Sequence, residues 1–149
     1  MKEKKEIGYA IKHAQQALHS AIDEALRSQN LTMSQYVVLF NLASHPGASS
    51  AELARISFVT PQTMIRLVKA LESGGLVARR ESTKSSRILE AQVTSKGKEV
   101  LHSAQAEVEA VYSQMLAGIQ EKEIDLVASS LNKMIRHLQE KRFASEVTK

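Results

Sequence analysis

Residues Thr60 to Arg87 read TPQTMIRLVKALESGGLVARRESTKSSR, and this stretch predicts a helix followed by a β-hairpin. The Thr60 hydroxyl can cap a helix by accepting a backbone N–H, and Pro61 suits the first helical position, where a donor would lack a partner. The helix is expected to end at Ser73-Gly74-Gly75, because glycine readily takes the left-handed conformation that terminates helices. Apolar side chains at helical spacing form one stripe, made of Met64, Leu67, Val68 and Leu71.

The residues after this helix predict two short strands. The first runs from Leu76 to Arg80 and the second from Arg87 to Val93, with a polar turn from Glu81 to Ser86 between them. A helix followed by a hairpin with a basic tip is the arrangement of a winged helix. In that arrangement the helix would lie in a DNA major groove and the hairpin would reach to its side.

Positive charge is concentrated in residues 55–87. This segment has seven Lys and Arg residues against two Glu, a net charge of +5, whereas residues 1–54 are neutral and residues 88–149 carry −1. A local excess of this kind is the electrostatic footprint of a phosphate-binding surface. On charge alone, a solvated basic face without a partner stays open as an alternative.

The composition of the chain argues against several classes of protein. Its 149 residues include no cysteine, which rules out disulfides, thiolate catalysis and zinc–thiolate sites. The five histidines are dispersed, and neither a glycine-rich phosphate loop nor a nucleophile motif occurs, so we expect no metal, no cofactor and no enzymatic activity. No apolar run approaches the roughly 20 residues that cross a bilayer, and the first ten residues, MKEKKEIGYA, lack the apolar core of a signal peptide, which predicts a cytoplasmic protein without a membrane partner.

Two helical patterns precede Thr60. An apolar stripe over residues 4–29 predicts one long helix, interrupted at Asn30. Thr32 and Gln35 form a capping box that predicts a helix from Met33 to Ser44. That helix is apolar nearly all round and is expected to be the buried centre of the domain, through Tyr36, Val37, Phe40, Leu42 and Ala43.

A second capping box predicts the helix that completes a helix-turn-helix. Ser49 and Glu52 form this box, and the short helix that follows should end near Ile56. A tight connection, Ser57-Phe58-Val59, joins it to the Thr60 helix. Two helices joined by a turn of about four residues, the second with a polar outer face, form a helix-turn-helix.

Two long helical patterns follow the hairpin. Thr94 caps the first, which runs to about Leu116, and the second runs from about Glu121 to Phe143. Together with the first helix they carry more apolar surface than a small winged domain can cover, which predicts contact with a second copy of the chain. We therefore predict a mainly α fold with a small β-hairpin wing. Residues 1–30 and 95–149 would form a helical dimerisation region, and residues 31–94 the winged helix-turn-helix. A monomer with internally paired helices is the alternative.

Several short motifs occur in one unbroken order along the chain. They are Leu31-Thr-x-x-Gln35-x-x-Val38-Leu39, then Glu52-Leu53-Ala54, then Arg66-Leu67-Val68-x-x-Leu71-Glu72-x-x-Gly75-Leu76-Val77-x-Arg79, then Arg87 and Val93-Thr94-x-x-Gly97. This combination resembles the MarR family of bacterial transcription regulators. The resemblance implies a homodimeric winged helix, usually a repressor, that binds a short palindromic operator in double-stranded DNA. Small phenolic or other aromatic-acid ligands commonly release such proteins from DNA.

Five residues of the Thr60 helix are the expected contacts of the helix with DNA. Gln62, Thr63 and Arg66 are expected to read base edges, because Gln can pair with adenine and Arg with guanine. Thr60 and Lys69 are expected to contact phosphates, which position the protein without reading the base sequence.

The wing is expected to add contacts at the minor groove, through Lys84, Ser86 and Arg87. The resembled family usually has Asp-x-Arg here, whereas this chain has Ser85-Ser86-Arg87, so Arg87 lacks the aspartate that would pin it. Arg79 or Arg80 could instead be a structural partner of Glu72 or Glu81, and for Arg79 this explanation is as good as a contact with DNA.

The resemblance also implies an effector pocket where the first, second and penultimate helices meet the winged part. On this chain it points to Lys12 and His13 on the first helix and to Met33, Tyr36 and Phe40 on the second. A cation or imidazole beside a tyrosine hydroxyl could hold an aromatic carboxylate. The alternative is that Tyr36 and Phe40 belong to the core.

Two other functions stay open from the sequence. One is a winged-helix module that binds protein, which the concentrated positive charge disfavours. The other is an architectural protein that binds DNA of any sequence. Comparing specific and random duplexes over a series of salt concentrations separates all three functions.

Overall fold

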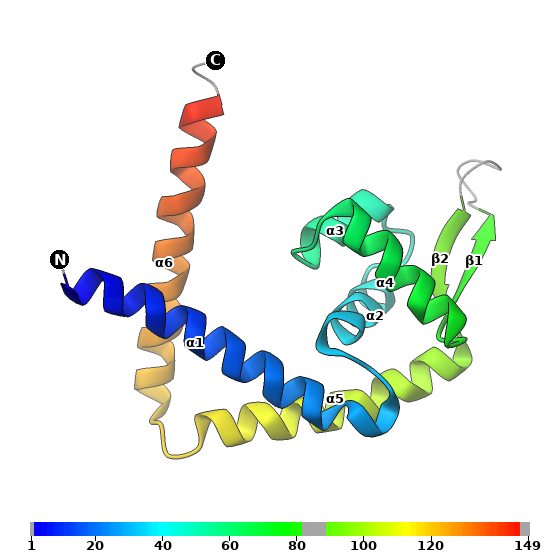
Figure 1. The fold of residues 1–149 in the computed structure, drawn as a ribbon, viewed down its shortest axis with the longest axis horizontal. Coiled ribbons are helices and arrows are strands. Elements are labelled where there is room, and N and C mark those ends of the chain that lie inside the picture. The colour runs from blue at the N-terminus through cyan, green and yellow to red at the C-terminus, as the bar shows by residue number, and fades with distance from the viewer. Residues whose placement is uncertain (1, 82–88, 147–149) are drawn as a thin grey trace. The chain divides into compact units, whose positions relative to one another are not determined.

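The computed structural model describes residues 2–81 and 89–146, with side chains described for residues 4–80 and 90–140. It confirms the predicted fold class, a mostly helical chain with one two-stranded antiparallel hairpin (Figure 1). The helices and strands are α1 (Lys2–Ala25), η1 (Arg27–Gln29), α2 (Met33–Ser44), α3 (Ser50–Ile56), α4 (Pro61–Ser73), β1 (Val77–Glu81), β2 (Leu89–Val93), α5 (Ser95–Leu116) and α6 (Glu121–Glu146).

The chain forms two compact units, Met1–Tyr112 and Ser113–Lys149. The first unit holds the helix-turn-helix, the hairpin, α1 and most of α5. Along the described residues, no helix is both long enough and apolar enough to cross a bilayer.

Both predicted capping boxes are present. At the start of α2, the Gln35 N–H donates to Thr32 Oγ1 at 3.2 Å and the Thr32 N–H donates to Gln35 Oε1 at 2.9 Å. At the start of α3, the Glu52 N–H donates to Ser49 Oγ at 3.1 Å and the Ser49 N–H donates to Glu52 Oε2 at 2.8 Å. These bonds satisfy donors that have no partner within the helix, and so they define where α2 and α3 begin.

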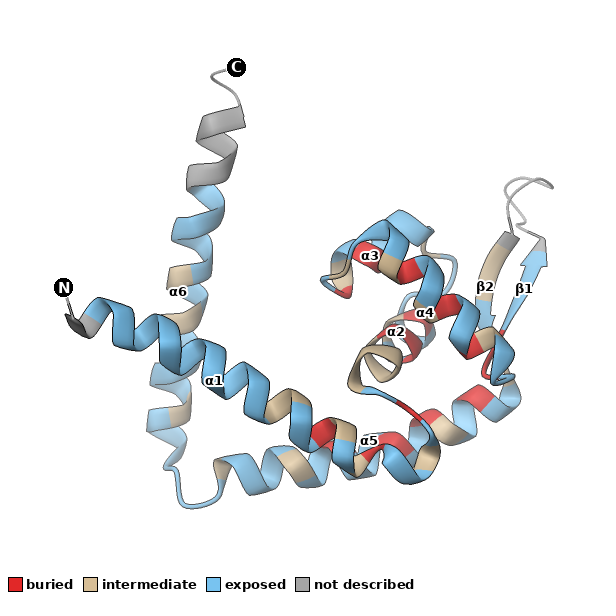
Figure 2. Ribbon diagram, viewed as in Figure 1, coloured by how far each residue is buried: buried red, intermediate tan, exposed pale blue. Residues whose placement is uncertain are grey.

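The core of the first unit is built from α2, α3, α4, the base of the hairpin and parts of α1 and α5. In Figure 2 the buried residues lie on these elements, whereas α6 and the amino-terminal half of α1 are mostly exposed. The largest fully buried side chains are Ile22, Leu26, Val38, Leu39, Met64 and Leu71.

The prediction that α2 is the buried centre of the domain is right for one side of the helix only. Its buried side chains are those of Val38, Leu39 and Leu42, whereas Phe40 is 40% exposed and Ala43 is exposed. Phe40 and Ala43 are three residues apart and therefore share one side of the helix. The small winged part packs against the other side of α2 and leaves this side open.

The first helix also ends earlier than the sequence predicted. α1 stops at Ala25, and residues Arg27–Gln29 form a single 3-10 turn. Asn30 then takes a left-handed backbone conformation with φ of 54°, which asparagine tolerates better than most residues. This turn reverses the chain into α2.

The end of α4 is joined to the start of α5 by hydrogen bonds. Gly75, with φ of 72°, ends α4 as predicted, and its carbonyl oxygen accepts from Thr94 Oγ1 at 2.7 Å. The carbonyl oxygen of Gly74 accepts from Lys96 Nζ at 2.9 Å. Thr94 Oγ1 also accepts from the Gly97 N–H at 3.0 Å, which caps α5. The carbonyl groups of the two glycines that follow α4 are thus satisfied by Thr94, which caps α5, and by Lys96 in its first turn.

Gly97 lets the two helices approach this closely. A Cβ atom at this position would lie only 2.1 Å from the carbonyl oxygen of Leu76, the second residue after Gly74. No side chain can occupy that space, because the neighbouring atom belongs to the backbone.

We predict that Gly97→Ala lowers the free energy of unfolding by at least about 2 kcal/mol, because the new methyl group pushes the start of α5 away from the backbone of Leu76. Urea unfolding followed by circular dichroism measures this loss. Gly8→Ala in α1 is the matched control, since a Cβ there meets no atom within 4 Å. The control should be neutral or gain up to about 1 kcal/mol from the better helix propensity of alanine. Equal stability of the two variants would contradict the close approach at Gly97.

Candidate nucleic-acid interface

The α4 helix presents a polar face to solvent and an apolar face to the core, as the sequence predicted. Gln62, Arg66 and Lys69 are exposed, and Thr63 is half-buried at the edge of the polar face. The opposite face supplies three buried side chains, Met64, Val68 and Leu71. Packing of the apolar face therefore fixes the direction in which the polar face points.

Hydrogen bonds of Thr60 define the start of α4. Its Oγ1 accepts from the Thr63 N–H at 3.2 Å and donates to Thr63 Oγ1 at 3.0 Å. A threonine hydroxyl has a single donor, which Thr60 uses for Thr63. The hydroxyl of Thr63 therefore keeps its own donor for a partner outside the helix.

The turn between α3 and α4 contains a residue that the sequence analysis did not single out. Phe58 is 92% exposed and has a left-handed backbone with φ of 54°. The preceding Ser57 is buried, and its Oγ accepts from Asn41 Nδ2 at 3.0 Å. An aromatic residue in a connection of four residues was the signal in the sequence.

The described part of the wing assigns a structural partner to Arg79. Its Nε donates to Glu72 Oε1 at 2.8 Å, so the ion pair holds β1 against the end of α4. The strands pair antiparallel, with Arg79 opposite Ala91 and Arg80 opposite Glu90. The predicted wing contacts lie outside the described residues; they are Lys84, Ser86 and Arg87.

The structure brings together the α2 part of the predicted effector pocket. Met33 and Tyr36 pack against the core, and the rings of Tyr36 and Phe40 lie 6.2 Å apart between centroids. Burial raises the pKa of the Tyr36 phenol above its usual value, and the charges of Tyr112 and Glu109 on α5 raise it further. The phenol is therefore neutral at physiological pH and able to donate a hydrogen bond.

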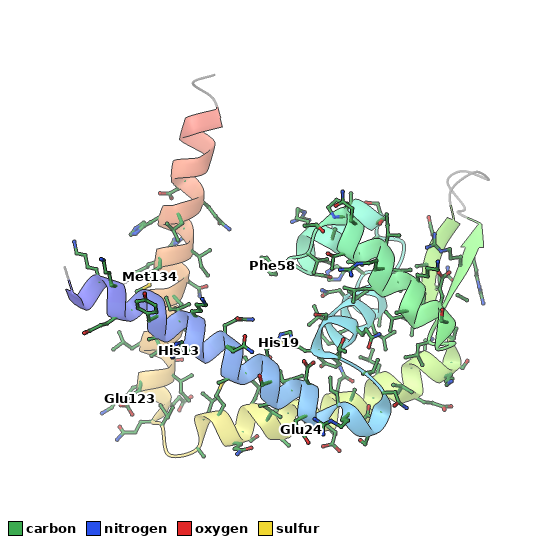
Figure 3. The ribbon with its side chains drawn as sticks, in the orientation of Figure 1. His13, His19, Glu24, Phe58, Glu123 and Met134 are labelled. Atoms are coloured by element: carbon green, nitrogen blue, oxygen red, sulfur yellow. The ribbon has the colours of Figure 1, made fainter. Side chains whose placement is uncertain are left out.

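The α1 part of that pocket is not brought to the same place within one chain. α1 meets α2 where Asp23 Oδ1 accepts from the Met33 N–H at 2.6 Å. Lys12 lies 11 residues earlier, roughly 16 Å away along the helix, and both Lys12 and His13 are exposed. His19 instead lies close to this contact, with its Nε2 3.3 Å from Asp23 Oδ2 (Figure 3). The four-residue spacing of His19 and Asp23 was the signal in the sequence.

A hollow of about 530 Å³ lies at the turn between α1 and α2. Its lining residues are Ser20, Asp23, Glu24, Arg27, Asn30, Leu31 and Thr32. None of the five predicted effector residues lines it. Among the described residues, no group of three or more His, Asp or Glu side chains could hold a metal ion.

The sequence is similar to those of known proteins. A sequence profile of the MarR family matches residues 29–88. The HTH-type transcriptional repressor Rv2887 of Mycobacterium tuberculosis is 38% identical over 113 residues, which cover 76% of this chain and 81% of that protein.

Solved structures show the same fold. A crystal structure of Rv2887 from Mycobacterium tuberculosis in complex with salicylic acid matches with a TM-score of 0.68 at 35% identity, over 85% of this chain and 94% of that chain. A complex of the same protein with p-aminosalicylic acid gives a TM-score of 0.69 at 35% identity, over 85% and 96% of the two chains. The transcriptional regulator SlyA gives 0.81 at 28% identity, over 91% and 95%.

We predict that Thr60→Ala lowers the free energy of unfolding by about 1 kcal/mol, because the Thr63 N–H loses its cap. Thr60→Ser keeps a hydroxyl at the same position and should retain most of the stability. Thermal unfolding of the two variants and the wild type measures the difference. If both variants melted together with the wild type, the hydroxyl would not stabilise the start of α4.

Proposed function

This chain belongs to the MarR family, and on that premise we propose that it represses transcription by binding a palindromic operator in double-stranded DNA as a homodimer. We further propose that a small aromatic acid or phenol releases it from the operator. As a member of this family the chain is a transcriptional regulator and not an enzyme. Its duplex target would place it in the cytoplasm.

The observation that carries the proposal is the exposed polar face of α4. Gln62 and Arg66 have the chemistry that distinguishes adenine and guanine in the major groove. The segment 55–87 around them has a net charge of +5, which favours approach to phosphates. Thr60 and Lys69 would position the helix on the backbone, and the wing would add Lys84, Ser86 and Arg87.

Exposed apolar side chains support the homodimer. They are concentrated on helices outside the winged part, where solvent exposure of several large apolar groups is unfavourable. On α1 they are Ile7, Tyr9 and Ile11, and on α6 they are Leu126, Val127, Ile135 and Leu138. A two-fold contact through these helices would cover them and would present two α4 helices to one palindrome.

The effector proposal is supported by the Rv2887 complexes with salicylic and p-aminosalicylic acids, at 35% identity to this chain. On this chain we propose the side of α2 that carries Met33, Tyr36 and Phe40 as the binding surface. Aromatic rings there would stack on a ligand ring, and the neutral phenol of Tyr36 would donate to a carboxylate or phenolate. Lys12 and His13 lie away from this surface within one chain, and their contact with the effector stays a prediction.

We predict that Arg66→Ala weakens binding to a duplex selected by the wild type from a random pool by more than about tenfold, because a base-edge contact is lost. Fluorescence anisotropy measures the affinities. Arg79→Ala is the matched control, since the Arg79 guanidinium is already paired with Glu72. The control should change the affinity much less than Arg66→Ala.

Sedimentation should show both arginine variants as folded dimers of the same mass as the wild type. Equal affinity of Arg66→Ala and the wild type would contradict the assignment of α4. A monomeric wild type that selects no duplex would contradict the whole proposal.

We predict that salicylate raises the melting temperature of the wild type, because a ligand that binds only the folded state stabilises it. Tyr36→Phe should reduce this rise, since it removes the donor but keeps the ring. Differential scanning fluorimetry over a panel of aromatic acids provides the measurement. A flat response across the panel would count against the effector site.

A further inference from the structure

Phe58 is a strained and exposed aromatic residue just before α4, the helix that we propose contacts DNA bases. Its side chain is 92% exposed, and its backbone φ is 54°. A residue other than glycine is strained in this region of backbone space, and asparagine and aspartate tolerate it better than phenylalanine does. Neither core packing nor backbone preference therefore explains a phenylalanine at this position.

The turn that carries Phe58 is rigidly held. The Phe58 N–H donates to the carbonyl oxygen of Arg55 at 3.3 Å, and the Val59 N–H donates to that of Ala54 at 3.0 Å. The buried Ser57 hydroxyl is tied to Asn41 on α2. These bonds hold the backbone of the turn in place before any partner arrives, which lowers the entropy cost of a contact through Phe58.

Phe58 lies close in the chain to the start of the proposed interface. It lies two residues before Thr60, the cap of α4, and four residues before Gln62. The first residues of the second helix of a helix-turn-helix are the ones that contact base edges. In Figure 3 the ring stands out from the turn between α3 and α4, on the side away from the β1–β2 hairpin.

We propose that Phe58 is a further DNA contact, which packs its ring on an apolar group of the operator beside the bases that α4 reads. DNA offers two such groups, the C5-methyl of thymine in the major groove and the deoxyribose of the backbone. The inference rests on the proposed function. A second copy of the chain is a less suitable occupant, because the apolar side chains that favour self-association are concentrated on α1 and α6.

The test compares Phe58→Gly, Phe58→Asn and Phe58→Tyr on the duplex that the wild type selects from a random pool. Gly and Asn adopt the left-handed backbone more easily, so both variants should melt at or above the wild-type temperature. They should nevertheless bind the duplex about three- to tenfold more weakly, because the ring is lost. Tyr keeps the ring and should restore the affinity.

Replacing each thymine of the duplex by deoxyuridine identifies the apolar group. If replacing one thymine per half-site weakens binding by the wild type but leaves the affinity of Phe58→Gly unchanged, the ring contacts the methyl group of that thymine. If Phe58→Gly is weaker on every duplex by the same factor, the ring contacts the sugar. Both results support the proposal.

The dependence on salt separates this contact from ionic contacts. An apolar contact releases no counterions, so Phe58→Gly should keep the wild-type slope of log affinity against log salt concentration. Lys69→Ala, as a phosphate contact, should reduce that slope by about one.

Wild-type affinity in both Phe58→Gly and Phe58→Asn would overturn the inference while leaving the proposed function intact. If these variants sedimented as monomers without DNA while the wild type was a dimer, the inference would also be overturned, since the ring would then serve self-association. Failure of the wild type itself to select a duplex would instead remove the proposed function.

Discussion

The close contact between the end of α4 and the start of α5 fixes the positions of α4, the hairpin and α5 relative to one another. Thr94 and Lys96 donate to the carbonyl groups of Gly75 and Gly74, which follow α4, and Gly97 lies against the carbonyl oxygen of Leu76. The α4 helix, the base of the hairpin and α5 therefore meet at one point. Because no flexible side chain lies between α5 and the Leu76 carbonyl, a change in the direction of α5 must move the end of α4.

A single amphipathic helix serves both the core and the proposed interface. The apolar side of α4 is buried through Met64, Val68 and Leu71, and its polar side is thereby aimed at solvent. The basic residues of the segment 55–87 favour approach to phosphates of any sequence, whereas Gln62 and Arg66 are suited to choose among sequences. Affinity and specificity would thus arise from different residues of one short segment.

Local chemistry explains why so much of the fold was predictable. Both capping boxes, the Thr60 cap and the glycine at the end of α4 depend on residues at most four positions apart, and all four were predicted correctly. The solvent-facing side of α2 was not predictable, since Phe40 and Ala43 are apolar residues, as are Val38 and Leu39. Which side is buried depends on elements far away in the chain. The same reason explains why Lys12 and His13, assigned by resemblance, do not meet Met33 within one chain.

The sequence by itself determined the order of the helices and strands, the ends of most of them, and the face of α4 that meets solvent. Periodicity and capping are properties of neighbouring residues, and they act before distant parts of the chain meet. Only the tertiary structure decided that Arg79 pairs with Glu72, that Gly97 must lack a side chain and that Phe58 is exposed on a strained turn. Each of these depends on where separate elements come to rest against one another.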